Sequence, residues 1–118
     1  MKKIFRTFAI VITLFIIQSC ASVAPTQFYR PQNYNGEPYR ISGKLEPMSG
    51  WAGRVTITIN DQPVIVENLP LFSNSTEGKG TFQGKTVIAF ITQVESLFSS
   101  YVRADVLIGN ERAASLTF

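Results

Sequence analysis

Apolar and polar side chains alternate along most of the chain after residue 38. The segment 39–46 reads YRISGKLE, in which every second residue is apolar or glycine and the residues between them are charged or polar. Segments 54–60 and 102–108 largely repeat this pattern. Successive side chains of a β-strand point to opposite faces, so a period of two predicts strands with one buried and one solvent-facing side.

Short runs of turn-forming residues separate these segments. Residues 60–63 (NDQP) and 84–85 (GK) favour turns, and Gly109-Asn110 suits a two-residue hairpin because both residues tolerate positive φ. About seven short strands follow one another, with no convincing helix among them. The sequence therefore predicts one all-β domain over residues 39–118, a small antiparallel β-sandwich or barrel.

One segment departs from the alternation. Residues 86–93 read TVIAFITQ, with Val87, Ala89 and Ile91 on one face and Ile88 and Phe90 on the other. A strand that is apolar on both faces is typical of a position covered on both sides. We therefore expect this segment to be the central, most buried strand, with Phe90 in the core.

The first twenty residues have a different character. Three basic residues fall within positions 1–6, residues 8–17 are almost entirely apolar, and Ser19-Cys20 follows. These are the parts of a secretory signal. Ten residues of helix cover about 15 Å, against about 30 Å of membrane hydrocarbon, so a membrane span is disfavoured. An uncleaved anchor, or a cleaved signal with a cysteine there by chance, are the alternatives.

The sequence Ile17-Gln18-Ser19-Cys20 resembles the lipobox of bacterial lipoproteins, although Gln18 stands where a small residue is usual. The resemblance implies that residues 1–19 are a signal peptide removed by a peptidase. It also implies a diacylglycerol on the Cys20 thiol and acylation of the new amino group, which would give a durable membrane anchor. Ala21 stands where Asp would signal inner-membrane retention, which favours the outer membrane of a Gram-negative envelope. The W-x-G stretch at Trp51, the turn GTFQGK at 80–85 and the segment NERAASLTF at 110–118 are loosely similar to small uncharacterised lipoproteins of Gram-negative bacteria, and no activity comes with that similarity.

Residues 20–38 are expected to be a lipidated N-terminus and flexible tether. Three prolines and an Asn-Gly pair interrupt regular structure there. An extended tether of this length would hold the domain up to about 50 Å from the bilayer. Its aromatic residues Phe28, Tyr29 and Tyr34 either pack back onto the domain or bind a partner.

Charge and composition exclude several function classes. Three of the eleven basic residues lie in the signal and all eight acidic residues lie after Cys20, so the mature side chains balance at eight of each sign. This removes the basic surface that nucleic-acid binding needs. The chain has no histidine and only one cysteine, which excludes histidine-dependent nucleophiles and His- or Cys-based zinc sites. Gly84-Lys85-Thr86 lacks the glycine spacing of a phosphate-binding loop. We expect no cofactor, metal, nucleotide or catalytic site.

Trp51 is the one residue singled out for recognition. It lies in a loop, SGWAG, between two predicted strands. It either offers a stacking platform for a sugar or peptide or plugs the end of a small barrel. The predicted function is a non-enzymatic, lipid-anchored β domain that contacts another envelope component, a protein or a glycan. The alternative is a small inhibitor or exclusion lipoprotein that blocks an envelope-targeted enzyme or receptor.

Overall fold

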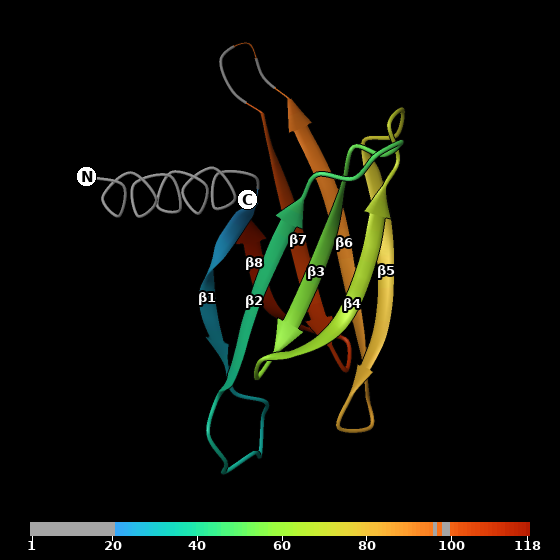
Figure 1. The fold of residues 1–118 in the computed structure, drawn as a ribbon. Coiled ribbons are helices and arrows are strands. Elements are labelled where there is room, and N and C mark those ends of the chain that lie inside the picture. Colours follow the sequence, from blue (N-terminus) through green and yellow to red (C-terminus); the bar gives the residue numbers. More distant parts are fainter. Residues whose placement is uncertain (1–20, 96, 98–99) are drawn as a thin grey trace, which may run out of the picture.

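The computed structural model describes residues 21–95, 97 and 100–118. Eight antiparallel strands form two four-stranded sheets, ordered β1-β2-β3-β4 and β5-β6-β7-β8 (Figure 1). The predicted all-β class is confirmed, and the two sheets form a small β-sandwich. The strands are β1 Ser22–Tyr29, β2 Tyr39–Glu46, β3 Gly53–Ile59, β4 Gln62–Leu69, β5 Ser75–Phe82, β6 Lys85–Glu95, β7 Ser100–Ile108 and β8 Glu111–Thr117.

The core lies between the inner faces of the two sheets. In β3 every second residue is buried from Gly53 to Ile59, as the alternation predicts. Side chains from all eight strands join this one apolar cluster, and the described residues include no buried polar or charged side chain. Burial of each large aliphatic side chain contributes about 1.5–3 kcal/mol. The innermost residues include Ile41, Val55, Ile57, Ile59, Ile65, Val87, Ala89, Ile91, Ala104, Val106 and Leu116.

The two sheets approach each other closely where β4 lies beside β5. A Cβ atom on Gly80 would lie 2.2 Å from the backbone oxygen of Val64, and one on Gly78 would lie 2.6 Å from Cγ2 of Ile65. Neither distance is possible for a real side chain. The two glycines of β5 therefore allow β4 and β5 to meet and close one edge of the sandwich.

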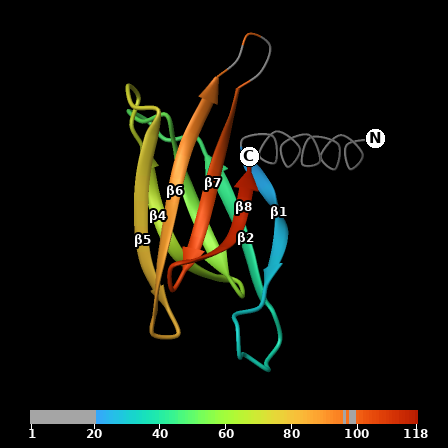
Figure 2. The ribbon, with the colours of Figure 1, turned by 180° about the vertical axis from the view of Figure 1, so that it is seen from behind.

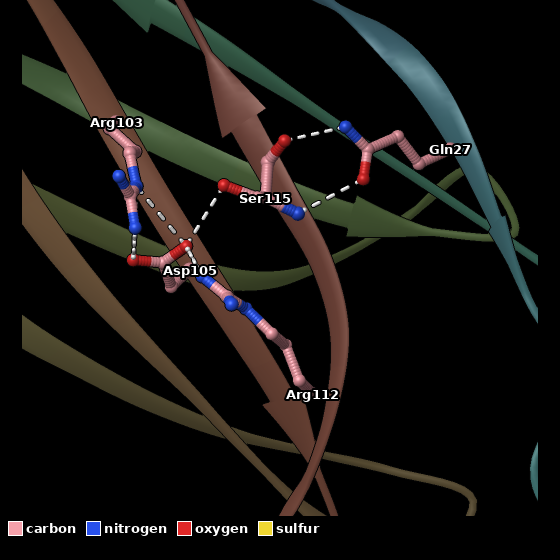
Figure 3. Close-up of polar contacts among 5 residues, drawn as sticks. All are labelled: Gln27, Arg103, Asp105, Arg112 and Ser115. Carbon is pink, nitrogen blue, oxygen red and sulfur yellow. Dashed lines mark hydrogen bonds and ion pairs between the residues drawn. The ribbon is translucent and has the colours of Figure 1, made fainter.

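The opposite edge is closed between β1 and β8, which lie side by side in both views (Figure 2). The Gln27 side chain accepts a hydrogen bond from the Ser115 N–H at 3.0 Å and donates one to the Ser115 carbonyl at 2.5 Å (Figure 3). One side-chain amide thus occupies both backbone groups of an edge-strand residue. Unpaired edge groups are a template for aggregation, so this contact protects β8.

The interpretation of residues 20–38 as a flexible tether is wrong for Ser22–Tyr29. These residues form β1, which is antiparallel to β2: Ser22 pairs with Leu45 at one end and Tyr29 pairs with Tyr39 at the other. Ala24 of β1 is fully buried. Pro25 indicated a tether, but it lies in a register irregularity between Ala24 and Gln27. A bulge in an edge strand tolerates proline because the missing N–H is not needed there. The folded domain therefore begins at Ser22.

The prediction that Phe90 belongs to the core is also wrong. Val87, Ala89 and Ile91 of β6 are buried, but Phe90 is 44% exposed on the outer face, opposite Asp105 in register. The described residues form only two layers, and among them no element covers the outer face of β6. The apolar residues on the outer face of β6 therefore lie on the surface of the sheet and do not form a second core.

Candidate functional site

The topology gives the sandwich two distinct ends (Figure 1). Eight strands that alternate in direction bring the chain back to the end where it started, so the first strand begins and the last strand finishes at one end. We call this the termini end. It comprises Ser22, Phe118 and the connections 47–52 and 70–74, together with Leu97 between β6 and β7. The opposite turn end comprises the connections 30–38, 60–61, 83–84 and 109–110.

Large apolar side chains are exposed in the connections of the termini end. Phe72 is 100% exposed, Leu97 94%, Leu71 57% and Trp51 44%. Among the described residues, no connection of the turn end carries an exposed large apolar side chain. Soluble surfaces normally scatter such residues singly. Their concentration in the connections of one end makes that end a candidate contact surface.

Trp51, Leu71 and Phe72 line one open hollow of about 420 Å³, together with Gly50, Pro70 and Ser73. The connection 47–52 is joined to the end of β4, directly before the connection 70–74, because the Ala52 N–H donates to the Leu69 carbonyl at 2.8 Å. Trp51 itself closes a tight turn, with its N–H donating to the Met48 carbonyl at 3.1 Å. The plug interpretation of Trp51 is wrong, since its ring forms a wall of a surface hollow and does not enter the core.

The connection 70–74 is held in place by Gln93 of β6. The Gln93 amide donates to the carbonyls of Pro70 at 3.2 Å and Ser73 at 3.1 Å. The Gln93 backbone N–H donates to the Asn74 carbonyl at 2.7 Å. These bonds satisfy three carbonyls of the loop from the second sheet. Leu71 and Phe72 are therefore presented outward by a braced loop.

The two connections that carry Trp51 and Phe72 have no charged side chain, whereas the exposed Glu95 lies at the same end, where β6 finishes. Connections 47–52 and 70–74 contain no Asp, Glu, Lys or Arg. Glu46, at the end of β2, is paired with Lys44 at 3.4 Å. A second hollow of about 250 Å³ opens between the sheets at the same end, and Ser22, Leu45, Tyr101 and Phe118 are among its lining residues. The termini end is thus apolar at its tips, which are the connections 47–52 and 70–74. Between the sheets it is lined by both polar and apolar residues.

The most connected polar group lies elsewhere, on the outer face of the second sheet. Asp105 accepts hydrogen bonds from Arg112 and the Ser115 hydroxyl, each at 2.9 Å, and from Arg103 (Figure 3). Partial burial acts to raise the pKa of Asp105, but the hydrogen bonds from Arg112, Arg103 and Ser115 outweigh it and lower that pKa. The carboxylate is fully compensated. It joins β7 to β8, and its partner Ser115 is also the residue whose backbone groups are bonded by Gln27 of β1.

Aromatic rings at the turn end are structural. Tyr39 is buried, with its ring centroid 5.2 Å from Phe82 and 5.4 Å from Tyr34. The Tyr29 hydroxyl donates to Glu111. Burial of Tyr29, followed by its bond to the Glu111 carboxylate, raises the pKa of Tyr29 to about 12. Tyr29 and Tyr34 therefore pack back onto the domain, which was one of the two expectations for them, whereas Phe28 is exposed on the outer face.

Comparisons with protein-family models, curated proteins and solved structures gave no match to this chain. Among the described residues, no group of three His, Cys, Asp or Glu side chains could hold a metal ion. Within the same part of the chain, no helix is both long and apolar enough to cross a membrane. Functional inference therefore starts from the residues of this chain and their arrangement.

Of the two residues that the sequence singled out, the structure describes one. Cys20, the predicted lipidation site, lies outside the described residues. Trp51 lies at the termini end beside Leu71 and Phe72, which sequence reasoning missed. Their signal was a pair of large apolar residues directly after Pro70, in an uncharged connection where solvent-facing residues are expected.

Proposed function

We propose that this chain is a lipid-anchored protein of the bacterial envelope, whose β-sandwich is a non-catalytic module that contacts another envelope component. The lipobox-like residues 17–20 support the anchor. The observation that carries the proposal is that β1 begins at Ser22, two residues after Cys20. A lipid on Cys20 would hold the sandwich directly by its termini end, without a spacer.

This attachment leaves the turn end and the outer faces of both sheets available to a partner. The outer face of the second sheet combines the half-exposed ring of Phe90 with the neighbouring Asp105 and Arg103. An aromatic ring beside fixed charges is suited to recognition of a protein or a glycan. Asp105 is occupied by its own partners, which supports a binding role over acid–base catalysis.

Mass spectrometry of the membrane-extracted protein tests the anchor. We expect loss of residues 1–19 and the added mass of acyl groups at Cys20. The variant Cys20→Ser is expected to accumulate as the uncleaved precursor, since the peptidase acts after the thiol is modified. A mature, normally cleaved protein without lipid would contradict the proposal.

Cross-linking in intact cells tests the binding role. The wild-type protein should yield a discrete cross-linked species that contains a second envelope component. Phe90→Ser should reduce that species, and Thr56→Ala on the outer face of the first sheet is the matched control. Equal yields from all three proteins would exclude the face around Phe90.

A further inference from the structure

Covalent geometry sets an upper limit on the distance between Cys20 and the folded domain. Each residue of fully extended chain spans at most about 3.6 Å, so the Cα of Cys20 lies within about 7 Å of the Cα of Ser22. The acyl chains of a lipidated cysteine lie in the membrane, so the start of β1 would lie at its surface. This inference rests on the proposed function.

The apolar connections lie on the same end and only a short way across the sheet. Ser22 pairs with Leu45 of β2, Leu45 pairs with Val55 of β3, and the β3 residue Gly53 pairs with Leu69 of β4. Neighbouring strands are about 4.8 Å apart, so three spacings separate β1 from β4 by about 14 Å. A surface that holds Cys20 therefore passes close to the tips of the connections 47–52 and 70–74.

The side chains at these tips are those that the membrane interface favours. Tryptophan is enriched at that depth, and Phe and Leu supply the apolar area that segments resting on a membrane bury, about 5–10 Å deep. Phe72 is fully exposed, Leu71 and Trp51 are about half exposed, and neither connection contains a charge that would have to be desolvated. The hydrogen bonds from Gln93 hold the second connection in this outward position.

We propose that the termini end rests on the bilayer that holds the Cys20 lipid, and that Trp51, Leu71 and Phe72 enter its interfacial layer as a second, apolar point of attachment. The lipid and the tips then fix the sandwich at two points and set its orientation. The uncharged tips bind through buried area and not through anionic headgroups. A bilayer of neutral phosphatidylcholine is therefore sufficient to bind the tips.

Trp51 is the only tryptophan of the chain, so its emission reports on this site alone. The mature acylated protein is placed in phosphatidylcholine vesicles, with and without lipids brominated near the headgroup end of their acyl chains. We expect blue-shifted emission, at least twofold quenching by the brominated lipid and little quenching by aqueous iodide. Added salt should leave this result unchanged.

Two variants and a control locate the contact. Leu71→Ser and Phe72→Ser should each reduce quenching by the brominated lipid at least twofold and increase quenching by iodide. Phe28→Ser is the control, because Phe28 is equally apolar and 67% exposed but lies near the turn end of β1. It should leave both quenching values as in the wild type, and thermal unfolding of each variant confirms that it is folded.

The possible outcomes separate this inference from the proposed function. Absence of the lipid by mass spectrometry of the same sample would overturn the proposed function. An acylated protein whose Trp51 is quenched by iodide and not by brominated lipid would overturn the membrane contact alone. Emission shielded from both quenchers would also overturn it, since the tips would then be covered by protein, such as a second copy of the chain.

Discussion

The two ends of the sandwich are built from the same strands and differ almost completely in their connections. At the turn end, Asn60, Asp61 and Asn110 adopt positive φ in tight polar turns, and Tyr39 and Phe82 are buried. At the termini end, Trp51, Leu71 and Phe72 face outward. The turn end shows that this sandwich closes without apolar tips. The apolar tips of the other end are therefore not a requirement of folding, which supports the proposed membrane contact.

Substitutions of aromatic residues at the two ends should accordingly differ in how much they lower the unfolding free energy, and the largest loss is expected at the turn end. Tyr39→Ala removes a buried ring that packs on Phe82 and Tyr34, which should cost about 3–5 kcal/mol of unfolding free energy. Trp51→Ala is the matched variant at the termini end and should cost less than about 1 kcal/mol. Urea unfolding measures both. Equal losses would show that the two ends are not different in the way described.

A smaller effect is expected from the residue that braces the apolar loop. Gln93→Ala removes two hydrogen bonds to the connection 70–74 and should lower the unfolding free energy by about 1–2 kcal/mol. Amide hydrogen exchange should accelerate in that connection and stay unchanged at the turn end. Thr92→Ala, on the outward-facing side of the same strand, is the control. A Gln93 variant with native exchange in residues 70–74 would mean that the loop holds its shape unaided.

The contact between Tyr29 and Glu111 should make the stability of the turn end depend on pH. The folded pKa of Tyr29 is about 12, raised from 10.0. The contribution of Tyr29 to stability is thus complete below pH 10.0 and is lost as the pH rises through about 12. Tyr29→Phe should lower stability by about 1 kcal/mol near neutral pH, and this difference should shrink in alkali. Absorbance titration should lose a step near pH 12 in this variant and keep it in Tyr101→Phe.

The smallest effect on the unfolding free energy is expected at Phe72, where the effect on membrane contact is expected to be large. Phe72→Ser replaces a side chain that is 100% exposed, so the unfolding free energy should change by no more than about 0.5 kcal/mol. The substitution Ile57→Ser in the core is the contrasting control and should prevent stable folding. A large loss of stability in Phe72→Ser would mean that the ring packs on the domain in solution, which would remove the distinction between the two ends.

Much of the fold follows from local pattern. The alternation over residues 39–46 and 54–60, and the Gly109-Asn110 hairpin, predicted strands and turns that the structure contains. Patterns with one buried face are reliable because side-chain direction along a strand is fixed by the backbone. The alternation does not say how many layers a fold has, and for that reason Phe90 was assigned to the core. It also fails for an edge strand such as β1, where a bulge at Pro25 interrupts the period.

Finding the candidate site required both the sequence pattern and the tertiary structure. A tryptophan in a glycine-flanked loop drew attention to Trp51 from the sequence alone. Its neighbours Leu71 and Phe72 lie about twenty residues further along and reach it only because β3 and β4 pair side by side. No local pattern encodes that meeting, since it depends on the register of two strands and on the hydrogen bonds from Gln93.

The sequence by itself determined the all-β class, the inward faces of most strands and the position of Trp51 in a glycine-flanked loop, but not whether its ring is exposed or buried. Only the tertiary structure decided which end of the sandwich receives the N-terminus. Strand direction alternates, so a domain of seven strands would begin and finish at opposite ends. The pairing of β1 with β2 makes the number eight, and it brings Ser22 to the same end as Trp51, Leu71 and Phe72.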